Sequence, residues 1–246
     1  YPQPLDLAMQ TRMRLAEIFK SERLEQRYHD ELGAIVALDA SAGGERTDRS
    51  RYLAGNAALV LAELRFETFA AVRLVQPFDE SLAEKQRLMD EALIDFEVLT
   101  TYQVADVTAA ATYYIAETYL EFSNSLLQSE RPSDLNAAER ADYDLVIEEE
   151  AYPFEEQALE IHEKNFELFA GGMHNDWVQQ SLDKLVTLMP GRYARNEISG
   201  GYLGSIDTYA YRMPIAPPPG VEPGQAIDED AADGQRSAEV AAQVSE

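Results

Sequence analysis

The sequence predicts an all-α protein, and three observations support this prediction. Nearly every segment before about residue 195 repeats its apolar residues at spacings of three and four, the period of an amphipathic helix. No segment shows the sustained alternation of apolar and polar residues, bounded by turn signals, that predicts a strand. The chain has 246 residues, 46% of them hydrophobic, so it can bury a core between such helices.

The first two helices follow from two short apolar stripes. We expect one helix from about Leu5 to Lys20 and another from about Leu24 to Leu38. The stripes consist of Met9, Met13, Ala16 and Phe19 in the first helix, and of Tyr28, Leu32 and Ile35 in the second. Residues 39–44 end on paired glycines, which adopt left-handed turns at little cost, so a loop is expected there.

The third helix is expected to begin near Thr47 or Asp48, since both residue types are good N-caps. It is the most apolar stretch of the chain, which predicts a central position. Its stripe consists of Leu53, Ala57, Val60, Leu61 and Leu64.

Two further helices follow a break at residues 76–79, which contain Pro77. Asp79 or Ser81 is expected to cap the first of them, whose stripe is Leu88, Ala92, Phe96 and Leu99. The second is expected to run from Val104 to about Leu127 and to end before residues 131–134.

The acidic stretch AYPFEEQALEIHEKN, residues 151–165, is either an acidic site with a histidine or one face of a glutamate-rich helix. The second interpretation is favoured because its apolar residues continue one helical stripe, from which most of the glutamates are absent. That stripe is Tyr143, Ile147, Phe154, Ala158, Ile161, Asn165 and Leu168. Pro153 removes a helical hydrogen bond, so it is expected to kink or split this helix.

The end of the helical region and the rest of the chain differ in composition. Gly171-Gly172 is expected to end the long helix, and Asn175 or Asp176 to cap a last one that stops before Met189-Pro190-Gly191. We therefore expect a helical domain over residues 1–195 and an irregular segment over residues 196–213. Residues 214–246 are rich in proline, glycine and acidic side chains and lack an apolar period, which predicts a disordered tail.

Charge and composition exclude several classes of partner. The net charge of −25 repels phosphate backbones and anionic bilayers, so neither nucleic acid nor a membrane surface is an expected partner. No run approaches the ~20 apolar residues that cross a bilayer. The chain has no cysteine, which excludes disulfides and thiolate metal sites and is compatible with either a reducing or an oxidising compartment.

The sequence contains no catalytic or metal-binding constellation. The three histidines, His29, His162 and His174, lack the Glu-x-x-His spacing of carboxylate-bridged metal sites, and no His-Glu-x-x-His occurs. We expect His162, which lies beside the stripe, to be a partly exposed or hydrogen-bonded helix residue. No enzyme activity, metal or cofactor is therefore predicted; the alternative is a helical, carboxylate-rich metal-binding protein or enzyme.

An internal repeat predicts how the helices are arranged. Leu15-Ala16 with Phe19, and Ile115-Ala116 with Tyr119, have the large-small-aromatic spacing of a first helix in a tetratricopeptide repeat. Ala92 with Phe96 has the second-helix spacing of an alanine followed four residues later by an aromatic. These patterns lie farther apart than the ~34 residues of the standard repeat. They predict an α-solenoid of helical hairpins with elongated, degenerate repeats.

Three strings give a more specific resemblance: AYPFEEQALEIHEKN, NDWVQQSLDKL and MPGRYARNE. With them, residues 5–196 resemble the C-terminal part of large tetratricopeptide-repeat proteins of Gram-negative bacteria that are associated with TonB, ExbB and ExbD-type energy transduction. This resemblance implies a non-enzymatic adaptor in the periplasm or cell envelope, with TonB-like, ExbD-like or outer-membrane partners. The residues themselves do not indicate the compartment, so a cytoplasmic location stays open.

The residues expected to contact a protein partner follow from the repeat alignment. The first helix of each hairpin is expected to line the concave face of a solenoid, and a strongly acidic surface favours a basic or mixed-charge segment. The predicted contact residues are Tyr113, Tyr114, Glu117 and Glu121, with Trp177 and Tyr193 as a terminal patch. Tyr113 and Tyr114 are adjacent, and spacing leaves open which of them faces inward.

Overall fold

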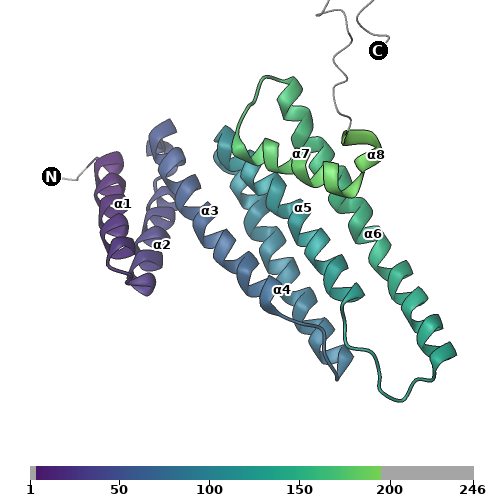
Figure 1. Cartoon of the computed structure of the whole chain (residues 1–246). Helices are drawn as coiled ribbons and strands as arrows, with labels where there is room; N and C mark the ends of the chain where they lie inside the picture. Colours follow the sequence, from purple (N-terminus) through teal and green to yellow (C-terminus); the bar gives the residue numbers. More distant parts are fainter. Residues whose placement is uncertain (1–3, 195–246) are drawn as a thin grey trace, which may run out of the picture. The chain divides into compact units, whose positions relative to one another are not determined.

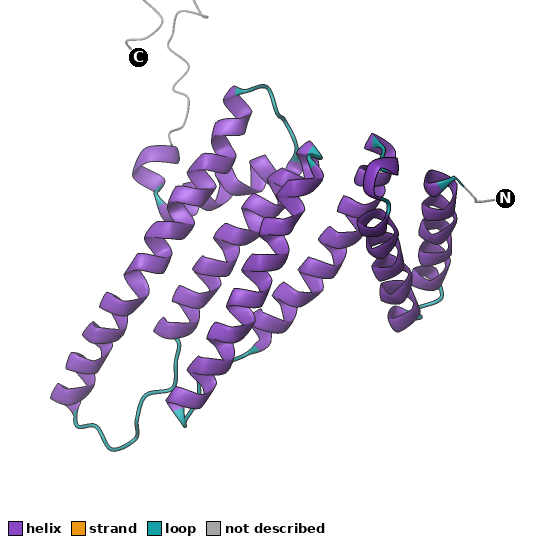
Figure 2. Ribbon diagram, turned by 180° about the vertical axis from the view of Figure 1, so that it is seen from behind, coloured by secondary structure: helices purple, strands orange, loops and turns teal. Residues whose placement is uncertain are grey.

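The computed structural model describes residues 4–194, and within that range the chain consists of helices joined by turns (Figures 1 and 2). The longer α-helices are α1 (Leu5–Ser21), α2 (Glu25–Ser41), α3 (Asp48–Ala71), α4 (Phe78–Leu99), α5 (Ala105–Leu127), α6 (Ala137–Ala170) and α7 (Asp176–Leu188). A short α8 (Pro190–Tyr193) and two 3-10 turns, Gly43–Glu45 and Thr100–Tyr102, complete the set. The all-α prediction is confirmed. The segments predicted at 196–213 and 214–246 lie outside the described residues.

Side-chain caps fix where several helices begin. Thr47 caps α3 by accepting from the Ser50 amide, and the Ser50 hydroxyl accepts from the Thr47 amide in return. Asn136 forms the same reciprocal capping box with Glu139 at the start of α6. Asn175 caps α7 by accepting from the amide of Val178. The caps expected at residue 47 and at residue 175 are therefore confirmed.

Three local predictions need correction. Helix α4 begins at Phe78 without a side-chain cap, because the Ser81 hydroxyl turns back and donates to the Val75 carbonyl at 2.8 Å. Residues 39–41, expected in a loop, form the last turn of α2. Pro153 does not split α6, since the helix is continuous from Ala137 to Ala170. The proline ring is exposed, which leaves it room on the solvent side of the helix.

The helices pack in a regular order. Each long helix contacts the next one along the chain, and α1 also contacts α3, α3 contacts α5, and α5 contacts α7. Among the described residues no comparable contact joins α2 to α4 or α4 to α6. The odd-numbered helices therefore touch in series, whereas the even-numbered ones are separated by the helices between them (Figure 1).

The core has two parts. One joins α1, α2, α3, α4 and α5, and includes Leu32, Ile35, Phe96 and Leu99. The other joins the C-terminal end of α3 with α4, α5 and α6, and includes Phe69, Phe122 and Ile147. The alanines of the predicted hairpin pattern, Ala16, Ala92 and Ala116, are all buried, and so are Ala62 of α3 and Ala158 of α6. Such small residues let two helices approach closely.

Ala158 provides a test of this close approach. It is completely buried on the side of α6 that faces α5, the side from which Phe154 meets Phe122 with ring centroids 4.7 Å apart. We expect Ala158→Leu to lower the free energy of unfolding by about 1–3 kcal/mol, because the larger side chain must displace neighbours in a packed interface. Urea denaturation measures the change. A variant as stable as the original chain would show that α5 and α6 do not approach closely here.

Candidate functional site

The structure brings three of the predicted contact residues together in an aromatic cluster between α5 and α7. The Trp177 ring centroid lies 5.6 Å from that of Tyr113 and 5.4 Å from that of Tyr114. Tyr114 also stacks on Phe96 of α4, at a centroid distance of 5.1 Å. The cluster therefore holds α4, α5 and α7 to one another.

Tyr113 is the inward-facing residue of the adjacent tyrosine pair. Its exposed fraction is 9%, whereas Tyr114 and Trp177 are half-buried. Burial, reinforced by the negative charges of Glu117 and Asp183, raises the pKa of Tyr113 to about 12. Tyr113 therefore stays neutral. Its side chain lacks the exposed surface that contact with a partner would require. The contact role of Tyr114 and Trp177 stays a prediction.

Glu117 lies in a buried polar cluster that joins α5, α6 and α7. Lys184 Nζ donates to Glu117 Oε2 at 2.6 Å, and His162 Nε2 lies 3.2 Å from Glu117 Oε1. Burial by itself raises the pKa of Glu117, but its contacts with His162 and Lys184 outweigh burial and leave that pKa below its ordinary value. Glu117 is therefore an internal connector of three helices.

The rest of this polar cluster extends from His162. Its Nδ1 lies 3.3 Å from the hydroxyl of Ser181, which also accepts from the Asn165 amide at 2.8 Å. Asn165 donates in addition to the main-chain carbonyl of Ala109, at 3.1 Å. The polar cluster thus consists of Glu117, His162, Asn165, Ser181 and Lys184. His162 was expected to be either partly exposed or hydrogen-bonded. It is hydrogen-bonded, and its side chain is completely buried.

The order serine, histidine, carboxylate within the polar cluster is also that of an acyl-transfer nucleophile with its base. Both Ser181 and His162, however, have an exposed fraction of 0%. A substrate cannot reach the hydroxyl while α5, α6 and α7 are packed together. Within residues 4–194 no group of three or more side chains is placed to hold a metal ion. The arrangement is suited to fixing the helices and not to catalysis.

The two remaining predicted contact residues lie in separate places. Glu121 is 3.4 Å from Nζ of Lys85, a completely buried side chain that also donates to the carbonyls of Phe69 and Val72 at the end of α3. The Tyr193 hydroxyl donates to Glu163 Oε1 at 2.7 Å and so ties α8 to α6. Neither residue joins the aromatic cluster.

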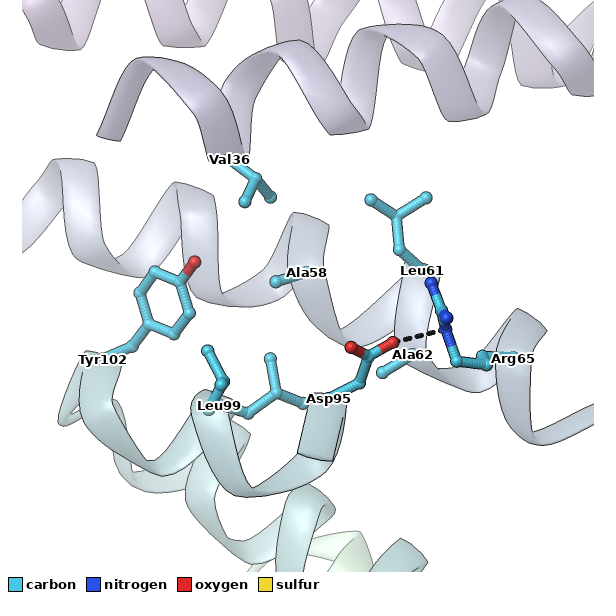
Figure 3. Close-up of a pocket in the computed structure, with 9 residues that line it drawn as sticks. Val36, Ala58, Leu61, Ala62, Arg65, Asp95, Leu99 and Tyr102 are labelled. Carbon is cyan, nitrogen blue, oxygen red and sulfur yellow. Dashed lines mark ion pairs between the residues drawn. The ribbon is translucent and has the colours of Figure 1, made fainter. Parts of the chain in front are cut away.

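Two grooves lie between even-numbered helices, each with an odd-numbered helix as its floor. The first, about 240 Å³ in volume, is bounded by Val36 of α2, by Leu61 and Arg65 of α3, and by Asp95 of α4 (Figure 3). Figure 3 shows the ion pair between Arg65 and Asp95 at one edge, with an N–O distance of 2.5 Å. This groove is polar where the pair closes it.

The second groove is larger, at about 430 Å³, and is predominantly apolar. Its walls and floor include Phe78 and Leu82 of α4, Phe122 and Leu126 of α5, and Val146 and Phe154 of α6. We call it the apolar groove. The sequence predicts each of these helices, but it carries no direct signal for the groove, which exists only because α4 and α6 do not pack against each other.

No helix within the described part of the chain combines the length and apolarity needed to cross a membrane. Comparison with protein-family models, with curated proteins and with solved structures finds no match to this chain.

Proposed function

We propose that this chain is a non-enzymatic scaffold for protein–protein interaction, built as an α-solenoid of tetratricopeptide-like hairpins with elongated, degenerate repeats. The observation that carries the proposal is the contact order of the helices. In stacked hairpins, the first helix of each hairpin touches both its own partner and the first helix of the next hairpin. The series α1, α3, α5 and α7 fits that order.

The chemistry of the site also supports a scaffold. The polar cluster joins α5, α6 and α7 through hydrogen bonds, and the hydroxyl of Ser181 is completely buried. The apolar groove, by contrast, opens to solvent between α4 and α6 and offers area for a partner. Large negative charge steers basic or mixed-charge segments toward such a surface and rejects acidic ones.

The resemblance of residues 5–196 supports a cell-envelope location and a TonB/ExbBD-type energy-transduction or transport assembly as the setting. On this proposal the partners are TonB-like or ExbD-like segments or outer-membrane components, and the chain contributes no catalysis of its own. A cytoplasmic scaffold with other basic partners would use the same surface.

The proposal predicts a salt-sensitive protein partner. The full chain, immobilised, is expected to retain a discrete protein from an envelope extract of a Gram-negative bacterium and to release it in about 0.5 M salt, where the screening length falls to about 4 Å. Mass spectrometry identifies the retained protein, and a column carrying heat-denatured chain is the control. An empty column, or a stoichiometric metal ion in the purified chain, would contradict the scaffold interpretation.

A further inference from the structure

The apolar groove is the open side of the second core. Phe78, Leu82 and Phe154 pack against the buried residues of this core from its outer side and are only half-buried. Their remaining apolar surface faces the space between α4 and α6. On α6 the neighbouring Val146 is 54% exposed, which extends the apolar surface out of the groove. A continuous apolar patch of this kind between polar rims is typical of a binding site.

One carboxylate lines the apolar groove, and two others lie outside its lining. Glu150 lines it from α6. Asp90 and Glu97 of α4 are exposed, and their charges act on Tyr119 of α5. Burial first, and then the charges of Glu97 and Asp90, raise the pKa of Tyr119. Negative charge is therefore present on the α6 wall of the groove, at Glu150, and on α4 outside its lining.

These carboxylates are left without cations. Within residues 4–194 none of Asp90, Glu97 and Glu150 forms an ion pair, although other acids of α4 do. Arg87, for example, bonds to Glu84 and Glu91 on another face of the helix. Lys85 does not serve the groove, because it is buried against the end of α3. The groove thus combines an apolar floor with a carboxylate, Glu150, that has no cationic partner among residues 4–194.

We propose that the apolar groove binds a basic amphipathic α-helix of a partner protein, with leucine-like side chains in the groove and lysines or arginines at its rims. This inference rests on the proposed scaffold function and names the kind of partner for one surface of it. A helix fits because the walls are two helices with a third between them, so apolar side chains at spacings of three and four can enter side by side. Because charges across an interface are complementary, the partner helix is expected to carry positive charge.

Other occupants have the wrong charge. Residues 196–246 of the chain itself contain more acidic than basic residues. A second copy of the chain would carry the same net negative charge as the first. Like charges placed across an interface are repelled, so neither is the expected ligand. Both are nevertheless outcomes that the test below can detect.

The probe is a designed, fluorescently labelled peptide of about 18 residues, long enough to form a helix. It carries leucines on one face and lysines on the flanks of that face. Fluorescence anisotropy with the full chain is expected to show saturable binding. A matched peptide with glutamate in place of every lysine should not bind. A third, with the leucines distributed around the helix, should bind at least about tenfold more weakly because it has no continuous apolar face.

Matched variants locate the binding. Val146→Gln is expected to weaken binding about tenfold, because it replaces an apolar contact at the mouth of the groove with a polar side chain. Val98→Gln, which changes an equally exposed valine of the first groove, should leave the affinity unchanged. Glu150→Gln should weaken binding by a few-fold and reduce its salt dependence, whereas Glu148→Gln, on another face of α6, should not. Equal losses from Val146→Gln and Val98→Gln, or no saturable binding at all, would overturn the proposal.

The absence of cysteine allows one further measurement on the full chain. In the variant Val146→Cys, a crosslinker attached to the single introduced thiol reports what occupies the groove. Capture of the basic peptide supports the proposal. A crosslink to residues 196–246 of the same chain, or to a second copy, would overturn it in favour of that occupant. An envelope partner that binds Val146→Gln unchanged would refute the groove proposal alone and leave the scaffold function intact.

Discussion

Phe96→Ala is expected to lower the free energy of unfolding by about 3–5 kcal/mol, the usual cost of removing a buried aromatic ring. Phe96 has an exposed fraction of 0%, and its ring stacks on Tyr114 with an interplanar angle of 5°. Through Tyr114 it also supports Trp177, so the change reaches from α4 to α7. Urea denaturation followed by circular dichroism measures the effect.

The control for this change lies on the same helix. Ile94 is 60% exposed, so Ile94→Ala should alter the free energy of unfolding by no more than about 0.5 kcal/mol. Similar losses from both variants would mean that Phe96 is not at the centre of the core. A reduced slope of the unfolding transition for Phe96→Ala alone would instead indicate that α1–α3 and α5–α7 unfold separately.

The faces of the helices were predictable from sequence because burial and helical period are directly linked. The stripe Leu88, Ala92, Phe96 and Leu99 is buried throughout, and the positions that separate its members on α4 are exposed or half-buried except for Met89. A residue's place on such a stripe depends on its own helix alone. The same holds for the N-caps Thr47 and Asn175, whose hydrogen bonds reach only three residues along the chain.

The residues that sequence reasoning misplaced depend on partners from other helices. His162 was expected to be a partly exposed or hydrogen-bonded helix residue. It is hydrogen-bonded but completely buried, because Glu117 of α5 and Ser181 of α7 both reach its ring. Neither partner can be inferred from the neighbours of His162 in the sequence. Tyr113 and Tyr114 present the same difficulty. Trp177 of α7 lies against both rings, and their burial depends on side chains of several helices.

The apolar groove was beyond sequence reasoning for a different reason. Phe154 and Ile147 belong to the predicted stripe of α6, and their partial or full burial agrees with it. The space beside them exists because α4 and α6 are both held by α5 and do not contact each other closely. A periodic pattern predicts which side chains turn inward, but it contains no measure of the distance between two helices that are not neighbours in the chain.

Glu117→Gln is expected to lower the free energy of unfolding by about 3 kcal/mol at neutral pH. The change removes the carboxylate that contacts both His162 and Lys184. Glutamine has the same shape and can still accept one hydrogen bond, so the loss is chiefly that of charge. The side chain of Glu117 is 14% exposed, and it faces both His162 and Lys184. Glu148→Gln, an exposed carboxylate of α6 without an ion pair in the described residues, is the matched control and should change stability by no more than about 0.5 kcal/mol.

The pH dependence separates this charge effect from a packing defect. In the folded protein the pKa of Glu117 lies below its ordinary value of 4.5. The ionised carboxylate therefore contributes its full stability above about pH 4.5. This contribution is lost as the pH falls through the pKa of the folded state. The difference in stability between the original chain and Glu117→Gln should therefore shrink as the pH falls below about 4.5. Comparing the two chains at each pH cancels the titration of the other acids, which both share. A difference that stayed the same under acid conditions would show that Glu117 is not held ionised by His162 and Lys184, and that its charge does not stabilise the contact of α5 with α6 and α7.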